Sequence, residues 1–132
     1  MENIDFDNLK KQLTKTFLEN SEEIINKVQL PLDKLRANPD DEESYNNLIN
    51  AFHSLKGSGS TYGFDVISAL GKDMEYLLKS AKGSVRKPVS GLIGLLDKAA
   101  GFLKDFFQSD ESSRQLMNNQ HPVFQAIRNW GK

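Results

Sequence analysis

The stretch AFHSLKGSGS at residues 51–60, continued by Gly63, holds the features that predict how this chain folds. An α-helix has about 3.6 residues per turn, so side chains three and four positions apart lie on one face. His53, Lys56 and Gly57 therefore share a face, which carries an imidazole, a cation and a position without a side chain. This face is the candidate for chemistry.

A second stripe of the same predicted helix is apolar and is expected to be buried. Its members recur at spacings of three and four: Tyr45, Leu48, Ile49, Phe52 and Leu55. His53 lies at the edge of this stripe and is expected to point outward. Gly57 and Gly59 each cost about 1 kcal/mol relative to alanine inside a helix. We expect the close approach of another backbone to offset that cost.

Length and charge favour one domain that binds no nucleic acid. The chain has 132 residues, enough for a single core, so we expect one domain over residues 1–132. Its core bundle is expected over about residues 5–108, with a helical extension over about 110–130. The 17 basic and 18 acidic residues give a formal charge of -1, which argues against binding through a basic field.

Several classes of site and location are excluded by composition. The chain has no cysteine, so thiolate nucleophiles, disulfides and cysteine metal sites are absent. The acidic N-terminus lacks the apolar segment of a signal peptide, and no stretch approaches the roughly 18 apolar residues of a membrane span. The ligand spacing of a dedicated metal site is also missing. We expect a cytoplasmic monomer without membrane insertion, metal or cofactor of its own.

The apolar pattern predicts helices along the chain and no β-structure. A first helix is expected to begin after a cap at Asp5 or Asp7 and to continue as far as Arg36. Pro31 is expected to interrupt or kink it, because proline lacks a backbone donor. A second helix, over about residues 42–58, carries His53 and follows an acidic turn.

Three further helices complete the predicted architecture. They span about residues 64–81, 92–107 and 122–130, the last with Pro122 at a favourable first position. A loop through Lys87 and Pro88 is expected to join the first two of these, and Ser109 to Ser112 is expected to be a loop with capping potential. The predicted fold is an all-α antiparallel four-helix bundle with additional helical segments at both ends.

The run His53-x-x-Lys56-Gly57-Ser58 resembles the histidine-containing phosphotransfer (HPt) family, with Gly63 ten residues after the histidine and Met74-Glu75 ending the next apolar repeat. Residues 17–82 are similar in particular to the HPt (P1) domain of chemotaxis histidine kinases. The resemblance covers about half of the chain directly, and the segment after Ser109 does not align. It implies a phosphocarrier of two-component phosphorelays.

The resemblance implies a role for each residue of the candidate face. His53 accepts a phosphoryl group on Nε2 and later gives it to an aspartate. Only a neutral ring has the lone pair for this attack, and a free imidazole, with a pKa of about 6.5, is largely neutral at pH 7. Glu75 matches the family's glutamate on the neighbouring helix and is expected to orient the ring through its other nitrogen. Lys56 is expected to stabilise charge on the phosphoryl group.

The partners implied by the resemblance are a response-regulator receiver domain and a histidine kinase. In this family the acceptor aspartate and its Mg²⁺ belong to the receiver, so the chain is a substrate and carrier, not an enzyme. Gly57 is expected to let the partner's loop approach. Gly63 is expected to let the third helix start against the second and is also counted among the partner-docking residues. Ser58 and Ser60 are polar contacts for a partner or simple caps.

Alternatives remain beside the free-standing carrier. The chain could equally be the phosphorylatable P1 domain fragment of a chemotaxis kinase. A different class is a helical interaction module that keeps the fold without the chemistry, but such a relative is expected to lose His53 or Lys56, and both are present. Gly57 to Ser60 is a weak match to a phosphate loop, since no Gly-Lys-Ser/Thr follows. Nothing resembles a nucleotide-binding kinase module, so autophosphorylation from ATP is not expected.

Overall fold

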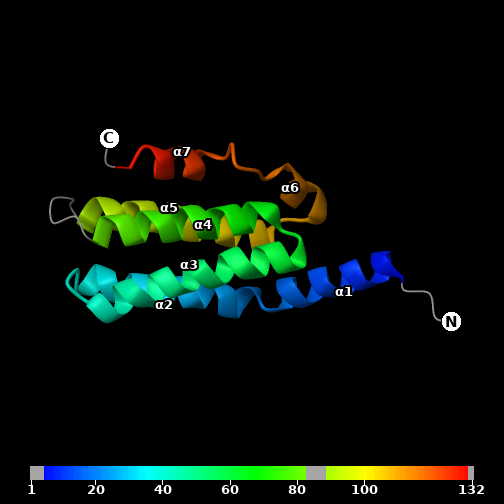
Figure 1. The fold of residues 1–132 in the computed structure, drawn as a ribbon, viewed down its shortest axis with the longest axis horizontal. Coiled ribbons are helices and arrows are strands. Elements are labelled where there is room, and N and C mark those ends of the chain that lie inside the picture. Colours follow the sequence, from blue (N-terminus) through cyan, green and yellow to red (C-terminus); the bar gives the residue numbers. More distant parts are fainter. Residues whose placement is uncertain (1–4, 83–88, 131–132) are drawn as a thin grey trace.

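The computed structural model describes residues 5–82 and 89–130, and within these ranges every regular element is an α-helix. In order they are α1 (Phe6–Glu19), α2 (Ser21–Ala37), α3 (Glu42–Tyr62), α4 (Asp65–Lys82), α5 (Val89–Gln108), α6 (Glu111–Leu116) and α7 (Pro122–Arg128). The predicted all-α bundle with helical segments at both ends is confirmed (Figure 1). The predicted loop through Lys87 and Pro88 lies outside the described residues.

Helices α2 to α5 form the bundle, and the terminal helices are added to it in different ways. Helix α3 packs against α2 on one side and α4 on the other, and α2 also contacts α5. Helix α1 runs beyond the end of the bundle, whereas α7 returns over it and contacts both α4 and α5 (Figure 1). No helix among the described residues is long and apolar enough to span a bilayer.

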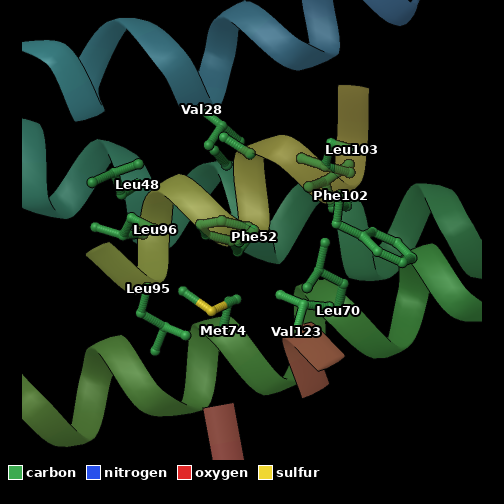
Figure 2. Packing of buried hydrophobic residues seen from close by; sticks show 14 of the residues in the cluster. Val28, Leu48, Phe52, Leu70, Met74, Leu95, Leu96, Phe102, Leu103 and Val123 are labelled. Carbon is green, nitrogen blue, oxygen red and sulfur yellow. The ribbon is translucent and has the colours of Figure 1, made fainter. Parts of the chain in front are cut away.

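The core draws side chains from all four bundle helices and from α7. Figure 2 shows Val28 of α2, Phe52 of α3, Met74 of α4 and Leu96 of α5 directed toward one interior, with Val123 of α7 beside them. All of these are at most 2% exposed. The apolar stripe predicted on α3 is buried as expected, with Tyr45 only partly so. Burial of this stripe leaves His53 at its edge, beside α4.

The predicted interruption at Pro31 is wrong, because the break between the first two helices lies at Asn20. Pro31 is inside α2 and buried, so it adds to the same apolar stripe as Val28 and Leu35. Packing of the ring against the bundle offsets the one backbone donor that proline removes. Asn20 has φ −92° and ψ 11°, outside the helical region, and α2 continues from it in roughly the same direction as α1 (Figure 1).

The loop with capping potential predicted at Ser109 to Ser112 is confirmed for Ser109 and for the cap at Asp110, but helix α6 already begins at Glu111. The Asp110 side chain accepts a hydrogen bond from the backbone N–H of Ser113 at 2.8 Å, as an N-cap residue does. Helix α6 has six residues and buries none of them. It therefore carries no apolar period from which it could be predicted.

Candidate functional site

Glycines set the distance between the two helices that carry the site. A Cβ built on Gly59 of α3 meets the backbone nitrogen of Ser68 at 2.4 Å, and one built on Gly71 of α4 meets the backbone of Phe52 and Lys56 at 2.5 Å. These are distances that real Cβ atoms do not reach. The predicted close approach of a backbone is therefore confirmed at Gly59, and Gly71 does the same from the opposite helix.

Further contacts fix the relative position of α3 and α4. The hydroxyl of Ser68 donates to the carbonyl of Lys56 at 2.8 Å, and the hydroxyl of Tyr45 donates to the carbonyl of Leu78 at 2.7 Å. Helix α3 ends at Gly63, whose φ of 82° lies in the left-handed region that favours glycine. The Phe64 N–H donates to the Gly59 carbonyl at 2.7 Å, which closes this turn.

His53 points outward from the edge of the core, as predicted. Its side chain is 64% exposed, and its Nδ1 lies 2.6 Å from Oε2 of Glu75 on α4. The two residues come from different helices, 22 positions apart in the sequence. The structure thus brings together the histidine and the glutamate that the sequence analysis selected.

Glu75 is buried, although it ends an apolar repeat and could have been a surface carboxylate. Its second oxygen, Oε1, accepts a hydrogen bond from Nζ of Lys56 at 3.0 Å, and Oε2 also lies 3.4 Å from Nζ of Lys79. Burial disfavours the charged form, but the contacts with Lys56, His53 and Lys79 outweigh it and lower the pKa of Glu75 to about 2. The carboxylate is therefore ionised at neutral pH.

The ionised carboxylate decides which nitrogen of the ring carries the proton. A carboxylate only accepts hydrogen bonds, so Nδ1 of His53 must be the donor in the contact with Glu75. When the ring is neutral, the lone pair then resides on Nε2, for which no hydrogen bond is present among the described residues. The arrangement can present a nucleophilic nitrogen to a partner while the rest of the ring stays fixed.

The residues predicted to face a partner lie beyond the histidine toward the end of α3. A Cβ at Gly57 meets nothing within 4 Å, and this position is exposed. Ser58 is half-buried and Ser60 is exposed, whereas Gly63 is the C-cap of the helix. Their predicted contacts with a partner stay predictions.

A groove of about 860 Å³ adjoins the site between α4 and α7. Lys56 and Glu75 are among its lining residues, and the C-terminal segment supplies Arg128 and Trp130. Tyr76 also lines this groove and is 76% exposed. The segment after Ser109 thus reaches the neighbourhood of the face that carries His53.

Sequence reasoning missed two residues of the site. Lys79 follows Glu75 by four positions on one helix, a spacing at which opposite charges pair, so the signal was present. Gly71 had only the general signal of a glycine inside a helix, and the partner backbone it approaches becomes visible only when the two helices are placed together.

Comparisons with known proteins identify the family of the chain. The family model of the Hpt domain matches residues 12–118. A curated relative is the chemotaxis protein CheA of Klebsiella aerogenes, which is 25% identical over 100 residues. The aligned residues make up 76% of this chain and 15% of that protein. No solved structure matches. A family match over most of the chain, together with the paired histidine and glutamate, places it plainly: the chain belongs to the Hpt domain family.

Proposed function

We propose that this chain is a histidine phosphocarrier that takes a phosphoryl group on His53 and exchanges it with an aspartate of a response-regulator receiver. The observation that carries the proposal is the 2.6 Å contact between Nδ1 of His53 and Oε2 of Glu75, on a side chain that is 64% exposed. This contact fixes the ring and leaves Nε2 directed to an incoming partner. Membership of the Hpt family supports the same chemistry.

The transfer step needs only groups that the two partners hold. The Nε2 lone pair attacks the phosphorus of an aspartyl phosphate, a nitrogen–phosphorus bond forms, and the phosphorus–oxygen bond breaks with its electron pair left on the aspartate. The proton on Nδ1 stays in place, and the negative charge of Glu75 faces the positive charge that the ring acquires. We expect Mg²⁺ on the receiver to neutralise the moving phosphoryl group.

The relative found in Klebsiella aerogenes favours a second form of this proposal. Because that relative is the chemotaxis protein CheA and this chain spans 15% of its length, the chain could serve as the phosphorylatable domain of a kinase of that type. A histidine kinase is then the donor and a receiver the acceptor. In both forms the chain is a substrate and carrier, expected to be monomeric and cytoplasmic.

Phosphoryl transfer to the purified chain tests the proposal. A phosphorylated receiver or kinase from the same organism is expected to transfer label that is lost in acid and retained in base. His53→Gln should remove the label and leave the helical circular dichroism spectrum and the melting temperature nearly unchanged, because an exposed side chain contributes little to stability. His121→Gln, which changes a histidine in another part of the fold, is the matched control. A folded chain that no such donor labels would instead support the interaction module.

A further inference from the structure

The contacts around Glu75 raise a question about Lys56. In the proposed function Lys56 pairs with the phosphoryl group, but in the structure its Nζ lies 3.0 Å from Oε1 of Glu75. A side chain that is 39% exposed can turn outward, but doing so removes a cation from a buried carboxylate. Before transfer the His53 ring is neutral, so turning Lys56 away takes a cation from a buried carboxylate, which is costly unless another cation stays beside Glu75.

Lys79 is in the position to supply it. Its Nζ lies 3.4 Å from Oε2, the oxygen that also accepts from His53, so it does not compete with Lys56 for Oε1. Lys79 stands four residues after Glu75 on the same helix, and therefore keeps its place when α3 and a partner move. Within residues 5–82 and 89–130, the cationic and imidazole groups in contact with Glu75 are Lys56 and His53 from α3 and Lys79 from α4 itself. Arg128 of α7 lines the adjoining groove.

We propose that Lys79 is a positioning residue for phosphoryl transfer, which keeps Glu75 paired and so releases Lys56 to bind the phosphoryl group. The two lysines have different roles: Lys79 balances the charge of the carboxylate while Lys56 is turned away from it, and Lys56 pairs with the charge that arrives on Nε2. This inference rests on the proposed function and adds to it a residue outside the His-x-x-Lys-Gly run.

A small phosphodonor tests the inference without any protein partner. With phosphoramidate, Nε2 attacks phosphorus, the phosphorus–nitrogen bond breaks, and ammonia leaves with the electron pair. We expect Lys79→Met to lower the rate of labelling about three- to ten-fold, the size of one or two weak charge contacts, and Lys79→Arg to restore most of it. The matched control is Lys82→Met on the same helix, whose amine donates to Asn46 at 2.6 Å and is expected to leave the rate unchanged.

A double-variant comparison separates release of Lys56 from simple support of Glu75. In a Lys56→Met background there is no lysine to release, so Lys79→Met should then change the labelling rate less than two-fold. If Lys79 merely supports Glu75, its removal should slow labelling in that background by the same factor as in the wild type, or by a larger one. Such an equal or larger cost would overturn the inference.

A spectroscopic readout checks that Lys79 acts through the carboxylate. The ¹³C resonance of the Glu75 carboxyl should titrate at a higher pH in Lys79→Met than in the wild type, and should not move in Lys82→Met. A titration unchanged in Lys79→Met contradicts the inference even if labelling slows. If phosphoramidate labels the wild type but the Lys79 variants behave like the control, only the inference fails; absence of label in the wild type refutes the proposed function and the inference together.

Discussion

Replacement of Gly71 by alanine tests whether the backbone contact between α3 and α4 builds the site. The added Cβ would lie 2.5 Å from the backbone nitrogen of Lys56 and from the carbonyl oxygen of Phe52. Ordinary contacts of a Cβ begin at 3.4 Å, so the two helices must separate locally by about 1 Å. Both neighbours are backbone atoms, and no rotation of a side chain can relieve the clash.

The magnitude follows from two opposing terms. Overpacking of this kind costs about 1–3 kcal/mol, with backbone clashes at the upper end. Replacing glycine by alanine inside a helix stabilises the helix by about 1 kcal/mol, which offsets part of this cost. We therefore expect Gly71→Ala to lower the free energy of unfolding by about 2 kcal/mol, which for a chain of this length is a fall in melting temperature of roughly 5–10 °C.

The same substitution should disturb the chemistry. Glu75 lies one turn after Gly71 on the same helix, so a local shift of about 1 Å carries it away from His53. The contact of 2.6 Å between Nδ1 and Oε2 then lengthens past the usual range of a hydrogen bond. The ¹⁵N resonances of the His53 ring should report a mixture of tautomers in place of one, and labelling by phosphoramidate should slow.

The control is Gly94→Ala on α5, because a Cβ there meets nothing within 4 Å. This variant keeps the gain in helix propensity without the clash, so it should be as stable as the wild type or up to about 1 kcal/mol more stable. Thermal unfolding followed by circular dichroism compares the two alanine variants. Equal melting temperatures for Gly71→Ala and Gly94→Ala would refute the argument that a glycine contact sets the spacing of the helices.

Three further predictions concern docking, pH and the C-terminal helix. Gly57→Trp adds bulk where a Cβ meets nothing within 4 Å, so the melting temperature should stay unchanged while kcat/KM for transfer from a receiver falls. Unchanged transfer would contradict the predicted approach of the partner. The pKa of Glu75 is lowered from 4.5 to about 2, so its ionised form stabilises the fold fully above about pH 5 and progressively less toward pH 2. The difference in unfolding free energy between the wild type and Glu75→Gln should therefore shrink as the pH falls over that range. A constant difference would argue against the lowered pKa. Phe124 is fully buried, so Phe124→Ala should lower the free energy of unfolding by about 3–5 kcal/mol and shift a single melting transition to lower temperature. A separate transition for the C-terminal segment would contradict the predicted single domain.

Local sequence patterns predicted most of the helices and one face of the site. Their failures have physical causes. The apolar period runs without a phase change from Phe17 to Ile24, so nothing in it marks the break at Asn20. Pro31 looked like a break because its missing donor is visible in the sequence, whereas its burial among the bundle side chains is not. The exposed helix α6 has a cap at Asp110 but no apolar stripe.

The pairing of His53 with Glu75 was predicted only through the family resemblance, yet the turn between α3 and α4 accounts for it. In an antiparallel helical hairpin, residues at similar distances from the turn lie side by side. Gly59 lies four residues before Gly63 and Ser68 five residues after it. Lys56 lies seven residues before Gly63 and Gly71 eight residues after it. Both pairs are in backbone contact. His53 and Glu75, ten and twelve residues away, continue the same register one turn further along. The left-handed conformation of Gly63 fixes where the turn lies, and the two close glycine contacts keep the helices from sliding. A glycine far from the imidazole therefore determines which residue of α4 faces it, so the predicted role of Gly63 need not be a contact with a partner at all.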